Sequence, residues 1–320
     1  MTTTEPVPVA APGQFFEVDG LRLHATIEGS GAPVVVLDSG AGGWSTAWGL
    51  VRPIVAESAT VIAWDRPGLG WSDPDREPAG HERTVELLHG LLRQSGLEGP
   101  YVLVGHSIGG LHVRHYAARY PADIAGVVLV DPTTEHMHDG SQVMPRPQRV
   151  LLGAAMRAAK LKAALKKGKD KPGGADSKAA KKQQARKPQK VDTSGFPESV
   201  VREFEAVTSR PAYLQAATAE KQVGKPAALA IVGLTFPSVP LTVISSTGED
   251  MRKVSYLLRF GLSPEWFAET LATTHRKIAQ LSPHGKWFAA EGTTHNIPVD
   301  APTVVAEAIL DVVGQVRERA

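Results

Sequence analysis

The chain has 320 residues, of which 42% are apolar and 21% charged, a composition typical of soluble globular proteins with one large domain or two small ones. It contains no cysteine, which excludes disulfide frameworks and thiolate metal sites. The N-terminus lacks a basic region followed by an apolar stretch, and no apolar run approaches the roughly 18 residues of a membrane-spanning helix, so we expect a cytoplasmic protein.

The formal net charge of +2 hides one strongly basic segment. Residues 157–190 contain 13 Lys and Arg against two Asp, so the remainder of the chain is acidic. Such a segment can bind anionic lipid or nucleic acid. Because it lacks interleaved aromatic residues, we expect a solvated loop and no nucleic-acid partner, with contact to an anionic surface as the alternative.

Short apolar runs alternate with longer amphipathic ones, as in proteins whose helices pack on a mostly parallel sheet. The predicted strands are an opening pair at residues 15–18 and 21–27, followed by 34–37, 60–64, 101–104, 126–130, 241–245 and 286–289. The predicted helices between them cover residues 46–56, 82–95, 108–119, 264–281 and 302–317.

About 110 residues separate the predicted strands 126–130 and 241–245, far more than one crossover helix needs. We therefore predict a helical cap inserted at residues 138–235, with a core made of residues 1–137 and 236–320. Helical periodicity in this region covers residues 149–167, 200–207 and 212–222. Residues 168–190, in contrast, are rich in Lys, Gly, Gln and Pro and are predicted to form a disordered loop.

Residues 105–109 read Gly-His-Ser-Ile-Gly and directly follow the predicted strand 101–104. A turn sharp enough to expose a serine between a strand and a helix crowds the backbone, and glycines two residues to either side relieve that crowding. The helix predicted over 108–119 is followed by Pro121. This context predicts a nucleophile elbow with Ser107 as the nucleophile.

A serine that attacks an acyl carbon needs a base, a carboxylate that orients the base, and amide donors for the oxyanion. We predict His295 as the base, because among the 11 histidines it alone lies in a loop expected at the carboxyl edge of the sheet. The glycine-rich turn at residues 38–44 allows close backbone approach to a ligand. From this turn we choose the amide of Ala41 as one oxyanion donor and that of Ile108 as the other.

These motifs together resemble the α/β-hydrolase fold, a superfamily of esterases, lipases, peptidases, C–C hydrolases and cofactor-free haloperoxidases. The motifs that carry the resemblance lie at residues 38–44, 64–72, 105–109, 130–132 and 292–295. The resemblance implies an α/β fold with a mostly parallel central sheet flanked by helices and an inserted cap. It also implies that Asp65 and Arg66 stabilise a loop. Many relatives have His-Gly where Ser39 and Gly40 stand here.

The resemblance offers two positions for the acid of a Ser-Asp-His triad. Most relatives carry it after the penultimate strand, which makes Asp250 a candidate, although Asp250 lies further from its strand than usual and Glu249 competes with it. Other relatives carry it one strand earlier, where Asp131 directly ends its strand and Pro132 fixes the following turn. We favour Asp131 and keep Asp250 as the alternative acid.

Ser107 argues against dehalogenase and epoxide hydrolase activity, because haloalkane dehalogenases and epoxide hydrolases of this fold have an aspartate at that position. No zinc-protease, phosphate-loop or dinucleotide motif is present, so we expect neither a metal nor a cofactor. The expected function is hydrolysis of a carboxylic ester of a small or medium-sized molecule. The alternatives are a C–C bond hydrolase, amidase or perhydrolase with the same triad, or a ligand receptor with low turnover.

Overall fold

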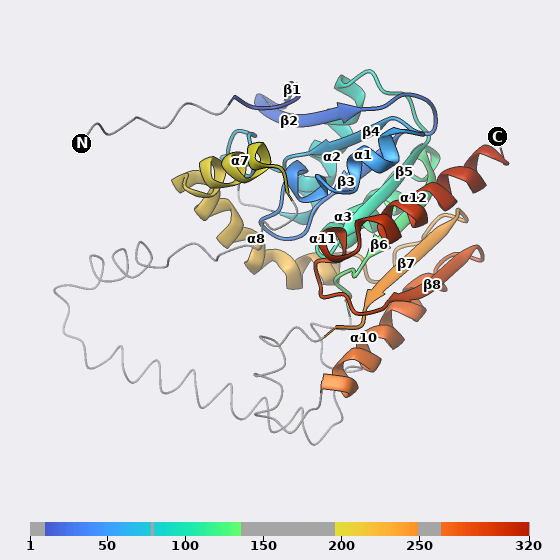
Figure 1. Cartoon of the computed structure of the whole chain (residues 1–320). Helices are drawn as coiled ribbons and strands as arrows, with labels where there is room; N and C mark the ends of the chain where they lie inside the picture. The colour runs from blue at the N-terminus through green and yellow to red at the C-terminus, as the bar shows by residue number, and fades with distance from the viewer. Residues whose placement is uncertain (1–9, 78–79, 136–195, 249–263, 320) are drawn as a thin grey trace, which may run out of the picture.

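The computed structural model describes residues 10–77, 80–135, 196–248 and 264–319 (Figure 1). Within these ranges, eight strands form one sheet in the order β1-β2-β4-β3-β5-β6-β7-β8. The strands are β1 (Gln14–Val18), β2 (Leu21–Glu28), β3 (Val35–Asp38), β4 (Val61–Trp64), β5 (Tyr101–His106), β6 (Ile124–Val130), β7 (Leu241–Ser246) and β8 (Gly285–Ala290). Strand β2 pairs antiparallel with β1 and β4, and every later pair is parallel, which confirms the mostly parallel sheet.

Helices cover both faces of the sheet. Those of the core are α1 (Arg52–Ala56), α2 (His81–Gln94), α3 (Gly109–Arg119), α10 (Pro264–Ala279), α11 (Ile297–Asp300) and α12 (Pro302–Arg317), with 3₁₀ helices η1 (Ser45–Trp48) and η2 (Pro121–Asp123). Helices α2, α3 and α10 supply apolar side chains to one buried cluster, and α1 and α12 supply them to the other. The sheet is therefore enclosed between two helical layers.

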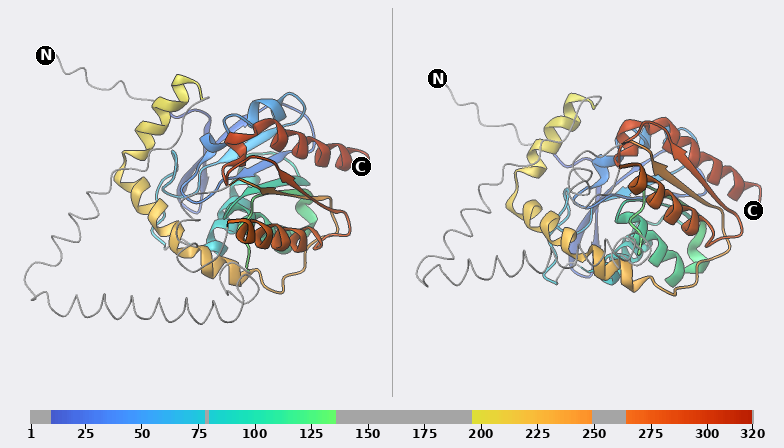
Figure 2. Two further views of the ribbon diagram at one scale, coloured as in Figure 1. Left: turned by 60° about the horizontal axis from the view of Figure 1, so that its bottom comes forward. Right: turned by 90° about the horizontal axis from the view of Figure 1, so that it is seen from below.

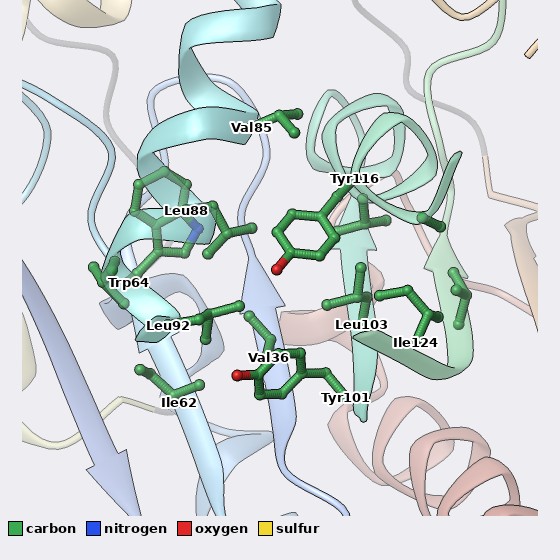
Figure 3. Packing of buried hydrophobic residues seen from close by; sticks show 14 of the residues in the cluster. Val36, Ile62, Trp64, Val85, Leu88, Leu92, Tyr101, Leu103, Tyr116 and Ile124 are labelled. Carbon is green, nitrogen blue, oxygen red and sulfur yellow. The ribbon is translucent and has the colours of Figure 1, made fainter. Parts of the chain in front are cut away.

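The two clusters arise because successive side chains of a strand point to opposite faces. In β3, Val36 packs toward α2 and α3, whereas its neighbours Val35 and Leu37 pack toward α1 and α12. Figure 3 shows Val36 in the first cluster, between Leu88 of α2 and Leu103 of β5. Strands buried on both faces read as continuous apolar runs, which is why the sequence predicts them well.

One predicted helix differs from the structure. Residues 46–56 form two short elements, η1 and α1, instead of one helix. Pro53 lies in the first turn of α1, where its missing N–H has no helical partner to lose, and Gly49 ends η1. The prediction of a continuous helix is therefore wrong at Gly49.

Two helices from the predicted cap are described, α7 (Glu198–Thr208) and α8 (Pro211–Ala230). Figure 1 shows both helices at the edge of the sheet toward which the parallel strands point, and α8 lies against the loops that follow β3 and β4. Figure 2 shows the same two helices from two further directions. Helix α8 continues well past residue 222, where its predicted end lies, because Ala227 and Ala228 are buried against Ile108 and Leu111. The predicted helix at residues 149–167, the predicted loop at 168–190 and the basic segment at 157–190 lie outside the described residues.

Across the described ranges, none of the helices combines the length and apolar character needed to cross a membrane.

His81, at the start of α2, is buried, and within the described part of the chain neither of its ring nitrogens has a hydrogen-bond partner. Burial, together with the neighbouring His112 and His115, lowers the pKa of His81 to about 2. In the unfolded chain a histidine binds a proton below about pH 6.5, whereas folded His81 stays neutral. Its pKa is lowered on folding, so stability falls as the pH drops from about 6.5 toward 2, by about 1.4 kcal/mol per pH unit.

The variant His81→Phe keeps an aromatic ring at this position and removes the titration. We expect the free energy of unfolding of the wild type, measured by urea titration, to drop by about 1.4 kcal/mol more than that of His81→Phe between pH 5.5 and 4.5. A difference between the two proteins that does not change with pH would contradict this assignment.

Candidate active site

Three of the residues predicted from the sequence meet at the carboxyl ends of the parallel strands. Ser107 follows β5, Asp131 follows β6 and His295 follows β8. The Oγ atom of Ser107 lies 2.9 Å from Nε2 of His295, and Nδ1 of the same ring lies 2.6 Å from Oδ2 of Asp131. The structure thus brings together a hydroxyl, an imidazole and a carboxylate that are separated by up to 188 residues in sequence.

Ser107 has a φ of 54°, a left-handed conformation that non-glycine residues rarely adopt. The flanking glycines allow it. A Cβ atom at Gly105 would lie 2.5 Å from the carbonyl oxygen of Gly109, and one at Gly109 would collide with the carbonyl of Asp38. The elbow predicted from the spacing of the glycines is therefore present as a strained turn that directs the serine toward His295.

Asp131 is 2% exposed at its side chain, whereas the ring of His295 is 30% exposed. Burial opposes ionisation of Asp131, but its hydrogen bonds with His295 and with the backbone N–H of Ser246 favour the carboxylate, and the pKa of Asp131 lies well below its usual value. An ionised Asp131 accepts a hydrogen bond from Nδ1 of His295. This tautomer leaves Nε2 free to accept the proton of the Ser107 hydroxyl.

Ser246, at the end of β7, holds the carboxylate from its other side. Its backbone N–H donates to Oδ1 of Asp131 at 3.0 Å, and its hydroxyl donates to Oδ2 at 3.0 Å. The sequence analysis missed this residue. Its position beside Asp131 depends on the register between β6 and β7, in which Val130 lies opposite Ile244, and no local motif reports that register.

A second histidine lies beneath the turn that carries Asp131, and it too was missed. His275 is fully buried, and its Nε2 donates to the carbonyl of Pro132 at 2.9 Å. Its Nδ1 accepts from the Ser245 hydroxyl at 2.7 Å, which in turn accepts from Nε1 of Trp287 at 2.7 Å. Burial lowers the pKa of His275, although the negative charge of Asp131 acts in the opposite direction. The His275 ring therefore stays neutral, and the ring that pairs with the Asp131 carboxylate is that of His295.

The glycine-rich turn lies against the elbow, as a Cβ atom at Gly40 would be 3.3 Å from Cβ of Ser107. Ala41 is exposed and Ile108 is buried. Among the described residues, neither the Ala41 amide nor the Ile108 amide donates a hydrogen bond within the chain. Two unused N–H groups on segments that flank the serine are what an oxyanion site requires.

Asp65 has the contacts of a loop-stabilising residue. Its carboxylate accepts the backbone N–H groups of Ser45 at 2.8 Å and Trp71 at 2.9 Å, and it pairs with the ring of His24. The alternative acid Asp250 and its neighbour Glu249 lie outside the described residues. Within the described ranges, no group of three or more His, Asp or Glu is arranged to hold a metal ion.

A cavity of about 320 Å³ adjoins the elbow at Ile108. Leu87 of α2 and Ala216 of α8 line its walls, and the buried polar residues Arg66 and Glu220 also face it. This volume falls at the lower end of the range for small-molecule sites, about 300–1,000 Å³. Ile108 connects this cavity to the serine turn, but neither Ser107 nor His295 is among its lining residues.

Comparisons with known proteins identify the family of the fold. A sequence model of the alpha/beta hydrolase fold family matches residues 32–202. An uncharacterized protein of Schizosaccharomyces pombe is 38% identical over 97 residues, which are 30% of this chain and 18% of that protein. A 2-hydroxy-6-oxo-6-phenylhexa-2,4-dienoate hydrolase of Burkholderia cepacia is 31% identical over 122 residues, which are 36% of this chain and 41% of that protein. The matched segments thus span less than half of the length of these curated relatives.

Among solved structures, a thermophilic esterase from Thermogutta terrifontis superposes with a TM-score of 0.59 at 21% identity, and the match covers 95% of this chain and 98% of that one. At this identity the likeness supports the fold alone. The family model, however, covers more than half of the sequence and includes the glycine-rich turn and the elbow. The chain therefore belongs to the alpha/beta hydrolase fold family.

Proposed function

We propose that this protein is a serine hydrolase that cleaves a carboxylic ester of a small or medium-sized molecule through an acyl-enzyme on Ser107. The observation that carries the proposal is the chain of contacts from Ser107 through His295 to Asp131, at 2.9 Å and 2.6 Å. A hydroxyl is a weak nucleophile, and an adjacent base oriented by a buried carboxylate is the arrangement that activates it.

In the first half of the reaction, Oγ of Ser107 forms a bond to the ester carbonyl carbon while Nε2 of His295 takes the hydroxyl proton. The carbonyl oxygen becomes an oxyanion, and the amides of Ala41 and Ile108 donate hydrogen bonds to it. Asp131 stabilises the imidazolium of His295. When the intermediate collapses, the C–O bond to the alcohol breaks, and the alcohol leaves with the proton from His295.

In the second half, a water molecule replaces the alcohol. His295 takes a proton from this water as its oxygen attacks the acyl carbon, and the same amides stabilise the second oxyanion. Collapse releases the carboxylic acid, and the proton on His295 returns to Ser107. The net reaction consumes one ester and one water and yields one acid and one alcohol.

Substrate choice in this proposal belongs to a cap formed by residues 138–235, of which α7 and α8 are the described part. The cavity is bordered by α2, by α8 and by the Ile108 turn, so both the core and α8 line it. This shared lining supports a role for α8 in substrate choice. The proposed core comprises residues 1–137 and 236–320.

C–C bond hydrolysis is the second candidate, because the Burkholderia cepacia relative is named a 2-hydroxy-6-oxo-6-phenylhexa-2,4-dienoate hydrolase. Its reaction would use the same base and oxyanion amides and would differ in the bond that breaks. The test is a side-by-side assay of p-nitrophenyl esters with acyl chains of two to eight carbons and of a vinylogous 1,5-diketone.

We expect turnover of at least one of these esters and none of the diketone. Turnover of the diketone with no hydrolysis of any ester would favour the C–C candidate. Turnover of neither class would contradict both candidates.

A further inference from the structure

The turn that carries Ala41 is clamped by a buried guanidinium. Arg66 is 2% exposed, and its Nη1 and Nη2 donate to the backbone carbonyls of Ser39 at 2.8 Å and Gly40 at 2.7 Å. The same guanidinium pairs with the buried carboxylate of Asp38. One side chain thus fixes two successive peptide units directly ahead of the proposed oxyanion donor.

The clamp on Gly40 determines where the amide of Ala41 points. The peptide unit between these residues is planar and trans, so its N–H is directed opposite to its C=O. The carbonyl of Gly40 is held by Arg66 and also accepts the backbone N–H of Gly43 at 2.9 Å. With the carbonyl fixed at both contacts, the peptide plane cannot rotate, and the N–H of Ala41 keeps one direction.

Residues of α8, in the proposed cap, hold both Arg66 and the turn. Glu220 of α8 is 8% exposed, and its carboxylate accepts from Nε of Arg66 at 2.5 Å and from Nη2 at 3.0 Å. The same carboxylate accepts the backbone N–H of Gly42 at 2.8 Å, and the Tyr213 hydroxyl donates to the carbonyl of Gly42 at 3.0 Å. Gly42 has a φ of +75°, which glycine adopts readily, and α8 contacts both its N–H and its C=O.

The neighbouring carboxylates of Glu220 and Asp38 favour the charged form of Arg66. Burial alone would lower the pKa of Arg66, but the charges of Glu220 and Asp38 outweigh it and raise the pKa above its ordinary value. A buried ion pair of this kind stabilises a fold little compared with apolar packing. Removal of one partner destabilises the fold, because the other charge is then buried without compensation. The pair between Arg66 and Glu220 fixes a position, because it joins α8 to the turn that carries Ala41.

We propose that Glu220 is a positioning residue of the oxyanion hole, acting through Arg66 and Gly42, so that the hole is complete only while α8 is docked on the core. This inference rests on the proposed serine-hydrolase function. The cap thereby contributes to the chemical step as well as to substrate choice.

Glu220→Gln tests the proposal. The carboxylate accepts three N–H donors, and in either orientation an amide turns its own NH₂ toward a donor of Arg66, which displaces the guanidinium. For p-nitrophenyl acetate we expect kcat to fall about 10- to 100-fold while KM stays within about threefold, because a misdirected donor weakens binding of the transition state more than that of the substrate. The rate constant for fluorophosphonate labelling of Ser107 is expected to fall by a similar factor.

The matched control is Glu203→Gln. Glu203 is the other buried carboxylate of the described cap helices, also 8% exposed, but its partners are the side chains of Trp44, Thr46 and Trp71. A loss caused only by loosening of the cap would be equal in the two variants, whereas the proposal expects Glu203→Gln to change kcat by less than about threefold. Glu220→Asp retains the charge opposite Arg66 with a shorter reach, and we expect it to fold and to lower kcat at unchanged KM.

Equal decreases of kcat in Glu220→Gln and Glu203→Gln, or a wild-type kcat in Glu220→Asp, would overturn the inference and leave the proposed function intact. A wild-type protein that neither hydrolyses esters nor is labelled at Ser107 would overturn the proposed function and the inference with it. The labelling of the wild type is therefore measured first.

Discussion

Asp131→Asn is expected to lower kcat for ester hydrolysis by about 10⁴-fold while the protein stays folded. The substituted amide has one acceptor and one donor group where the carboxylate has two acceptors. If its NH₂ faces His295, the ring is driven into the tautomer whose Nε2 carries a proton and cannot accept one from Ser107. If its NH₂ takes the place of Oδ1 instead, it meets the backbone N–H of Ser246, which donates to Oδ1 in the wild type.

The comparison variant is Asp250→Asn, at the other position that the sequence offers for the acid. We expect its kcat to remain within about threefold of the wild type, because His295 already pairs with Asp131 at 2.6 Å. Steady-state kinetics measure the kcat of both variants, and thermal unfolding shows whether both are folded. A loss of several orders of magnitude in Asp250→Asn, with Asp131→Asn nearly unaffected, would assign the acid to residue 250.

His295→Ala is expected to lower kcat by about 10⁴- to 10⁶-fold, since among the described side chains no other base is hydrogen-bonded to the Ser107 hydroxyl. The nearest ring, that of His106, lies with its centroid 4.9 Å from that of His295, and its Nε2 donates to the backbone carbonyl of His295. That carbonyl contact directs Nε2 of His106 away from the serine, so we expect no substitution of one ring for the other.

His284→Ala provides the control, because His284 is exposed in the turn before β8. Both alanine variants are assayed with the same ester at pH 7 to 9, where an unassisted serine has its best chance to react. Activity of His295→Ala within tenfold of the His284→Ala value would exclude His295 as the base.

Much of the fold and the centre of the site could be predicted because their signals are local. Strand β6 is apolar along its whole length, β5 is apolar from Tyr101 to Val104, and the elbow is specified by five consecutive residues. Asp131 directly follows a predicted strand, and His295 lies in the loop after another. Parallel strands bring their carboxyl ends to one edge, so placing these residues needs only the order of the elements.

The supporting residues could not be predicted, because they act across large sequence separations. Ser246 reaches Asp131 over 115 residues, and Glu220 reaches Arg66 over 154. Each contact depends on strand register or on helix docking, which sequence periodicity does not report. The extension of α8 past residue 222 has the same origin, since burial of Ala227 and Ala228 against the α3 region stabilises a helix across a segment containing Gly224 and Pro226.

The central claim is that Ser107 is an activated nucleophile. Its most direct test is to incubate the full chain with a fluorophosphonate, digest it and locate the adduct by mass spectrometry, with Ser107→Ala in parallel. The account predicts a single stoichiometric adduct on Ser107 in the wild type and none in the variant. An unmodified Ser107 in the folded wild-type protein, or equal labelling of Ser107→Ala, would contradict it.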